Sequence, residues 1–207
     1  MGSRLYRNAS WVLGALLLYA IYSAVRIGAA DFLSIEAADA ANSIPALADA
    51  SRKLSWARRL TPDDPERLDD SAVLALHQAG LPGVAPAEKK ALLRAGLVHA
   101  RSAVVLRPAY AYGWAILLRF KHELREYDAE FGQALRAVAT LGPWEPGLQA
   151  LALDVGMAAW PKLSPNEQEQ VMAIYLRGMQ SQPDRMTDIL RSHAPPCADE
   201  ADGECGR

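Results

Sequence analysis

The sequence has few of the residues that favour β-structure. Its 207 residues include only 10 valines, 7 isoleucines and 3 threonines, against 38 alanines and 28 leucines. Branching at Cβ restricts a side chain in a helix, whereas Ala and Leu are good helix formers. A mainly β fold is therefore excluded, and we expect an all-α fold with about one domain's length of helices.

An excess of charge of one sign is also absent. The chain has 22 Lys and Arg residues against 24 Asp and Glu residues, which leaves a formal net charge of −2. Binding to nucleic acid needs a basic footprint that this balance does not supply. The 51% hydrophobic content likewise excludes a long disordered chain. We expect no nucleic-acid partner.

The usual motifs of catalysis and cofactor binding are missing as well. The sequence contains no phosphate-binding glycine loop, no G-x-S-x-G elbow and no H-E-x-x-H pair. Its four histidines are scattered, and we expect them on helix surfaces or packed against neighbours: His77, His99, His122 and His193. The sequence therefore predicts no catalytic residue, no cofactor and no metal site.

Cysteine occurs only as Cys197 and Cys205, close to the carboxyl terminus. Residues 194–207 are polar with several Pro and Gly residues, and we expect this tail to be disordered. In an oxidising compartment the two thiols could form a disulfide. The alternative, two unpaired thiols in a mobile tail, stays open. No second cysteine pair or nearby histidine completes a metal-ligand set.

One long uncharged run, residues 9–25, lies near the amino terminus between Arg4 and Arg7 on one side and Arg26 on the other. A helix of about 20 apolar residues crosses a bilayer, and the usable range begins near 17. If Arg26 extends its head to the lipid headgroups, the span continues to residue 30. Residues 1–30 are therefore predicted to be a cytoplasmic start followed by a transmembrane signal-anchor, with the bulk of the chain exported.

Two other interpretations of this segment stay open. Gly28-Ala29-Ala30 has the small residues of a cleavage site, so the segment could be a cleaved signal peptide. A fully apolar helix could also be buried in a soluble core, although it would need a large core around it.

The rest of the chain is predicted to be a series of helices separated by Pro and Gly. The expected ranges are 31–43, 45–60, 66–79, 86–106, 109–125, 127–141, 145–160, 165–181 and 184–193. Capped helix starts are indicated by Thr61 and Asp63 before Pro65, and by Ser164 with Glu167 three residues later. We assign residues 31–44 to a membrane-proximal helix and residues 45–193 to a helical domain.

Four of these helices end at a proline with the same residue pattern before it. The positions twelve, eight and five residues before each proline hold only apolar or small residues, on one helix face. They are Ala50, Leu54 and Ala57 before Pro62; Gly96, Ala100 and Ala103 before Pro108; Phe131, Leu135 and Val138 before Pro143; and Val171, Tyr175 and Gly178 before Pro183.

The segment that follows Pro108 resembles a tetratricopeptide repeat. Trp114 lies six residues after the proline, Leu117 three residues later, and Tyr127-Asp128 at the expected turn between two helices. The resemblance implies helical hairpins that stack into a tetratricopeptide-like array with a concave surface for ligands.

The sequence departs from the repeat pattern at three positions. Leu118 replaces a small residue, Lys121 stands where an aromatic residue is expected, and Gln149 stands where the next repeat would have Trp. The spacing between the prolines is also irregular. The repeats are therefore degenerate, and a helical bundle that uses proline as punctuation is the alternative.

Aromatic and polar side chains alternate between residues 114 and 160, which is typical of a groove that holds a peptide or a sugar. The candidate groove residues are Trp114, Arg119, Lys121, Trp144, Glu145, Gln149, Asp154 and Trp160. In the alternative, the tryptophans pack between helices and the charges face water. Asp154 lies in an apolar run and, if buried, needs a partner such as Arg119 or Arg136.

Four acids gather near one predicted turn: Glu123, Glu126, Asp128 and Glu130. Acidic residues stabilise the beginning of a helix, and we favour this interpretation over a cation site.

A longer set of segments suggests a more specific relationship. Leu141-Gly-Pro-Trp-Glu-Pro, Tyr127-Asp-Ala-Glu-Phe and the stretches around Trp114 and Trp160 resemble the VpsP family. These are small membrane-anchored helical-repeat proteins encoded with bacterial exopolysaccharide synthesis genes. The segments are also similar to repeat tails of O-antigen-polymerase-like proteins. The resemblance covers about residues 85–193.

The resemblance implies an accessory role without catalytic residues, in a single-pass protein of the bacterial inner membrane with its bulk in the periplasm. We expect an adaptor that supports exopolysaccharide synthesis or export by binding a synthase, a polymerase or an export protein at the membrane. Two alternatives remain: a generic envelope assembly scaffold or chaperone, and a polysaccharide lyase or hydrolase.

Overall fold

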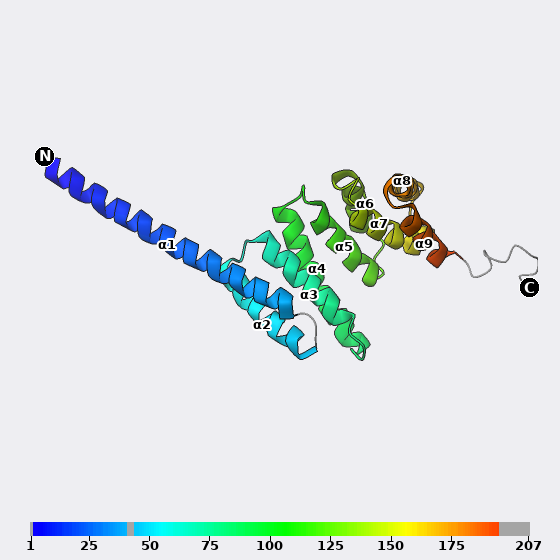
Figure 1. Cartoon of the computed structure of the whole chain (residues 1–207), viewed down its shortest axis with the longest axis horizontal. Coiled ribbons are helices and arrows are strands. Elements are labelled where there is room, and N and C mark those ends of the chain that lie inside the picture. Colours follow the sequence, from blue (N-terminus) through cyan, green and yellow to red (C-terminus); the bar gives the residue numbers. More distant parts are fainter. Residues whose placement is uncertain (1, 41–43, 195–207) are drawn as a thin grey trace, which may run out of the picture. The chain divides into compact units, whose positions relative to one another are not determined.

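The computed structural model describes residues 2–40 and 44–194, with side chains described at 11–33, 47 and 49–194. Within these residues the chain is all-helical and has no strand. Figure 1 labels the helices α1 (Gly2–Ala40), α2 (Ile44–Leu60), α3 (Pro65–Ala79), α4 (Pro86–Leu106), α5 (Ala111–Glu123), α6 (Ala129–Leu141), α7 (Pro146–Ala159), α8 (Pro165–Ser181) and α9 (Pro183–His193). A single 3₁₀ turn, Trp160–Lys162, follows α7. The all-α prediction is confirmed.

From α2 onward, the helices begin and end within two residues of the ranges that the sequence predicts. The Ser164–Glu167 capping box is confirmed in both directions at the start of α8. At α3 the prediction is wrong in detail, because Asp64 accepts the hydrogen bond from the Glu66 amide (3.0 Å). Thr61 instead donates its hydroxyl proton to the Ala57 carbonyl at the end of α2 (3.2 Å).

Helix α1 continues without a break through residues 31–40, which we had assigned to a separate membrane-proximal helix. No proline interrupts this stretch, so nothing in the sequence ends the helix there. Residues Trp11–Leu33 of α1 are long and apolar enough to cross a membrane, with a mean hydropathy of 1.7. The apolar window within this stretch has no buried residue, unlike the core helix of a soluble domain, which argues against the buried-helix alternative.

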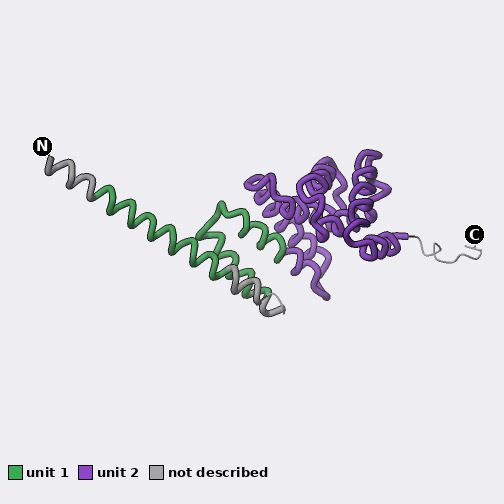
Figure 2. The backbone as a smooth tube through the Cα atoms, turned by 45° about the horizontal axis from the view of Figure 1, so that its top comes forward, with its two compact units in different colours: residues 1–74 green, residues 75–207 purple. Residues whose placement is uncertain are grey.

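The chain divides into two compact units, residues 1–74 and 75–207, which Figure 2 shows in different colours. The division falls inside α3. In unit 1, α1 and α2 pack against each other. Leu47, Ala50, Leu54 and Ala57 are the buried residues of α2. They lie on one face of the helix, three or four residues apart.

In unit 2, each hairpin stacks on the next. Helix α5 packs on α4, α6 and α7, and α7 packs on α6, α8 and α9, while α6 also contacts α8. Helix α7 contacts both α5 and α9, and α6 contacts α8. These contacts place α5, α7 and α9 in one layer, and α6 and α8 in another. This arrangement is the tetratricopeptide-like stack that the proline pattern predicts.

The four proline-terminated helices end in the same way. The residue before each proline donates its amide proton to the carbonyl four residues earlier, at 2.8–3.1 Å: Thr61 to Ala57, Arg107 to Ala103, Gly142 to Val138 and Gln182 to Gly178. A residue that precedes proline is disfavoured in the helical conformation, so each helix stops there. Of the twelve residues that define the pattern, all but Tyr175 are buried.

The repeat extends to one side-chain hydrogen bond. The Trp114 indole N–H donates to the carbonyl of Pro108 (2.8 Å), six residues earlier. The Gln149 amide donates to the carbonyl of Pro143 (2.7 Å), also six residues earlier. Gln149 therefore departs from the repeat in residue type and keeps its hydrogen bond.

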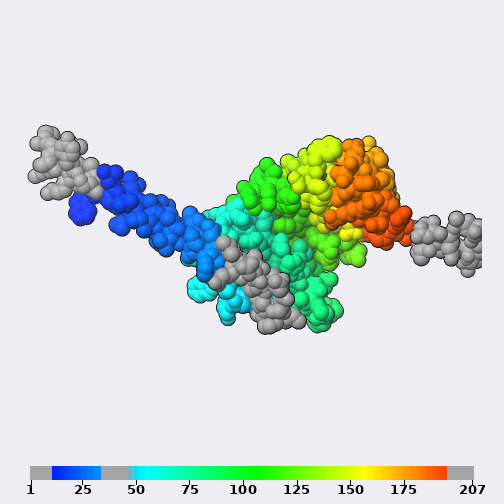
Figure 3. All heavy atoms as spheres, viewed as in Figure 1, coloured from blue at the N-terminus to red at the C-terminus, as the bar shows by residue number. Residues whose placement is uncertain are grey.

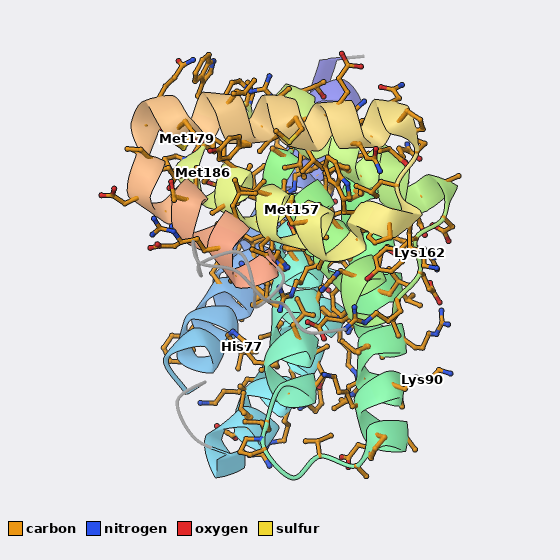
Figure 4. All side chains as sticks on the ribbon, turned by 90° about the vertical axis from the view of Figure 1, so that its right-hand side faces the viewer. His77, Lys90, Met157, Lys162, Met179 and Met186 are labelled. Atoms are coloured by element: carbon orange, nitrogen blue, oxygen red, sulfur yellow. The ribbon has the colours of Figure 1, made fainter. Side chains whose placement is uncertain are left out.

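Glycine allows close packing between the layers. A Cβ added to Gly156 of α7 would lie 2.5 Å from a methyl carbon of Val171 on α8, whereas a Cβ added to Gly147 on the same helix would meet nothing within 4 Å. Met186 of α9, labelled beside Met179 in Figure 4, similarly fills the space above Gly178.

We predict that Gly156→Ala destabilises the protein by about 1–3 kcal/mol, because Val171 is stiff at χ1 and cannot move aside cheaply. Gly147→Ala, the control on the same helix, should be neutral or stabilising by up to about 1 kcal/mol. Chemical unfolding of the full chain in detergent micelles, followed by circular dichroism, measures both. Equal effects of the two substitutions would contradict the packing described here.

Candidate functional site

The structure separates the eight candidate groove residues into three groups. Trp114, Lys121 and Gln149 are buried, with 9%, 1% and 2% of their surfaces exposed. Arg119 and Asp154 lie on the surface of the α5–α7–α9 layer. The remaining residues, Trp144, Glu145 and Trp160, lie outside both groups.

The buried group contains an ion cluster around Lys121. Its ammonium nitrogen Nζ lies 2.6 Å from Asp128 Oδ2, 3.0 Å from Glu126 Oε2 and 3.2 Å from Glu130 Oε2. Arg101 of α4 holds Glu130 by two hydrogen bonds of 2.7 and 2.6 Å. A lysine that replaces an aromatic residue therefore remains buried because three carboxylates surround it.

The electrostatics of this cluster favour the charged form of every member. Burial alone would lower the pKa of Lys121, but hydrogen bonds from its ammonium group to Asp128, Glu126 and Glu130 outweigh burial and raise it. Burial would raise the pKa of Glu126 and of Asp128, but their hydrogen bonds from Lys121 lower both below the usual range. The hydrogen bond from Arg101 lowers the pKa of Glu130.

The acids near this turn act as helix-start and pairing groups, as favoured above. Asp128 is the N-cap of α6 and accepts hydrogen bonds from the backbone amides of Glu130 and Phe131, both at 3.1 Å. Glu126 pairs with Arg94 of α4. The cluster therefore ties α4 to the α5–α6 hairpin, and its role is structural.

A second set of charges crosses the exposed surface of the α5–α7–α9 layer. Arg119 of α5 lies 3.7 Å from Asp154 of α7, and Asp154 lies 2.8 Å from the His193 Nε2 of α9. Arg119 also pairs with Glu123 (2.9 Å), which lies 3.4 Å from Lys89 of α4. We call these five residues the polar ladder.

The ladder is accessible to solvent. The Arg119 and Asp154 side chains are 38% and 43% exposed, and that of His193 is 22% exposed. Arg119 is one of the two partners, with Arg136, that the sequence proposes for Asp154, although Asp154 is not buried. At the Lys89 end, a hollow of about 290 Å³ opens between α4 and α5, lined by Pro86, Lys89, Lys90, Leu93, Glu123 and Leu124.

His193 and Lys89 were not predicted as site residues. The spacing from the preceding proline contains a signal for His193. Arg119 lies eleven residues after Pro108, Asp154 eleven residues after Pro143, and His193 ten residues after Pro183. Equivalent positions of stacked repeats lie side by side. A comparison of charged residues, as well as apolar ones, at equal distances after each proline would have identified these three ladder residues.

In the third group, Trp144 and Glu145 lie at the turn that precedes α7, and Trp160 follows that helix. Tyr112 donates its hydroxyl proton to Glu145 Oε2 (3.0 Å), and the Tyr110 and Tyr112 rings are 5.7 Å apart. Trp144 is 64% exposed. Trp160 is half-buried and starts the 3₁₀ turn, where its carbonyl accepts a hydrogen bond from Gln168 (3.1 Å).

The predicted pair Cys197 and Cys205 lies outside the described residues. Comparison with known proteins adds no further constraint, since no family model and no curated protein sequence matches this chain.

We predict that Lys121→Met destabilises the protein by about 3 kcal/mol at neutral pH. That value is near the low end for a broken buried pair, because the three acids left behind are partly exposed. Lys90→Met is the control, since this lysine points into solvent from α4 (Figure 4), and its effect should stay within about 0.5 kcal/mol.

The Lys121 effect should depend on pH with a definite sign. Carboxylates whose folded pKa is lowered stabilise the protein above their usual pKa values, and this contribution is lost as pH falls through the lowered values. Wild type should therefore lose stability below about pH 4, while Lys121→Met, which keeps only the pairs of these acids with Arg94 and Arg101, should lose less. A gap between the two proteins that stays constant from pH 7 to pH 3 in denaturant unfolding would disprove this account.

Proposed function

We propose that this chain is a membrane-anchored helical-repeat adaptor that supports exopolysaccharide synthesis or export by binding a protein of that machinery through the polar ladder. The observation that carries the proposal is the ladder itself. It places three charged or titratable groups from three successive repeats in one partly exposed row. The VpsP-like segments supply the choice of machinery.

The physical argument begins with exchangeable charge pairs. Arg119 and Asp154 are 3.7 Å apart, which is long for an ion pair, and both are partly exposed. Exposed pairs of this kind contribute about 0–1 kcal/mol to stability. A partner segment with complementary charges can therefore replace the internal pair at small cost, and the alternation of sign along the ladder fixes its register.

The anchor supports the same function. Helix α1 contains 23 residues, Trp11–Leu33, of sufficient length and hydropathy to span a membrane. A protein held at a membrane meets membrane-bound partners at a raised effective concentration, so modest affinity at the ladder is sufficient. We infer a single-pass protein of the inner membrane whose helical stack faces the periplasm.

We predict that the double variant Arg119→Gln with Asp154→Asn folds normally and loses partner binding. Arg191→Gln with Asp188→Asn is the matched control, because this pair of α9 is exposed (68% and 74%) and 3.7 Å apart. A photo-crosslinking residue at Ile116, on α5 near the ladder, should capture a synthase, polymerase or export component in cells. This crosslink should disappear in the ladder variant and persist in the control.

Four outcomes would overturn the proposal. If the crosslink persists in the ladder variant, or is lost equally in both variants, the ladder is not the binding surface. Crosslinks to many unrelated exported proteins would favour a general chaperone. Unchanged polymer secretion in a clean deletion strain would exclude the adaptor role, and shortening of the polymer by the purified full chain would favour an enzyme.

A further inference from the structure

Side-chain exposure along α1 shows where the protein begins to cover this helix. Residues 11–22 are exposed without exception. Figure 3 shows one face of this segment in dark blue. From there on, one face becomes covered: Ser23, Arg26 and Leu33 are half-buried, and Ala30 is fully buried. These residues are three or four apart and lie on one side of the helix. The part of α1 available to lipid on all sides therefore ends near Ser23.

Helix α2 makes the main contact with α1, and its length explains this limit. The two helices pack side by side and run in opposite directions (Figure 1). Its 17 residues extend about 25 Å at 1.5 Å per residue. The end of α2 therefore lies level with residues 23–26 of α1, where the coverage begins.

A buried arginine fixes the next element at nearly the same level. Arg67, in the first turns of α3, is only 7% exposed and pairs with Asp31 of α1. It also lies 3.6 Å from Asp64 and 3.5 Å from Asp70. Three carboxylates in this region are thus held by one guanidinium group, and the α2–α3 turn is tied to residue 31 of α1.

A bilayer places this level near the lipid headgroups. If Trp11 lies at one interface, the hydrocarbon core of about 30 Å ends some 20 residues later, near Ala30. The end of α2, level with residues 23–26, then lies about one to two helical turns on the hydrocarbon side of that boundary, and long arginine side chains there extend toward the headgroups. Its last turn is basic, with Arg58 and Arg59. Trp56, one turn earlier, is 53% exposed, and the Arg59 guanidinium carbon lies 4.9 Å from the centre of its ring.

We propose that Arg26, Trp56, Arg58 and Arg59 form a collar that binds phospholipid headgroups where α1 leaves the membrane. Tryptophan is favoured at this depth because its ring is apolar and its N–H is polar. Arginine reaches phosphate oxygens with its long side chain and forms charge-assisted hydrogen bonds to them. Anionic headgroups strengthen the contact further. This inference rests on the proposed membrane anchor, because without α1 in a bilayer the collar meets no lipid.

The test uses the full chain labelled with 5-fluorotryptophan in nanodiscs of zwitterionic and anionic phospholipid, with and without a gadolinium-chelating lipid. Substituting Phe for each tryptophan in turn assigns the five fluorine signals. We expect the gadolinium-chelating lipid to broaden the signals of Trp11 and Trp56 several-fold relative to discs that lack it.

Two charge variants separate the collar from general electrostatics. Arg58→Gln with Arg59→Gln should reduce the broadening of Trp56 at least twofold. The control, Arg52→Gln with Lys53→Gln, removes the same charge nearer the start of α2. It should leave the broadening of the Trp56 signal unchanged. Replacing the anionic lipid by zwitterionic lipid should act in the same direction as the first variant.

The outcomes distinguish the two proposals. If gadolinium does not broaden Trp11, the membrane anchor is wrong and the collar falls with it. If Trp11 is broadened and Trp56 is unchanged by gadolinium, the anchor stands and the collar is wrong. Equal responses of the two charge variants would overturn the role assigned to Arg58 and Arg59.

Discussion

The structure of unit 2 depends on one constraint, which is that a helical hairpin cannot bury its own apolar face. Each hairpin here covers that face against the next, so α5, α7 and α9 form one layer and α6 and α8 another. The constraint explains why residues twelve, eight and five before each proline are apolar or small. It also explains Gly156, where the layers approach so closely that a single methyl group would collide with Val171.

Stacking fixes the positions of charges as well as apolar residues. At the α5–α6 turn, the aromatic position of the repeat holds Lys121, and the acids of the turn and two arginines of α4 complete the cluster around it. On the outer surface of the α5–α7–α9 layer, equivalent positions hold Arg119 and Asp154. The same repeat geometry thus gives two kinds of charge cluster. Around the buried Lys121 the ammonium group is paired with three carboxylates, whereas in the exposed ladder Arg119 and Asp154 are 3.7 Å apart. Only the second is open to a partner.

The helices, their limits and the repeat could be predicted from the sequence because proline and the apolar spacing are local signals. The burial of Lys121 could not, since it requires Asp128 and Glu130 to approach it across a turn and Arg101 to approach from another helix. For the same reason the sequence did not reveal which of the eight candidate groove residues are buried. Trp114 and Gln149 have the residue types of a binding site, but their hydrogen bonds run back to Pro108 and Pro143. Residue type alone does not distinguish a groove from a repeat signature.

Helix α1 meets two different requirements along one continuous element. Residues 11–22 are exposed and almost entirely apolar, which suits lipid, whereas Ala30 is fully covered by protein. No proline separates the two parts, so the helix is continuous. The depth of one part in a bilayer therefore fixes the depth of the other. Asp31 cannot lie in hydrocarbon without large cost, and its pairing with Arg67 holds it in the folded part of unit 1. This pair therefore sets how deeply α1 can enter a bilayer, and with it the level at which the basic end of α2 stands.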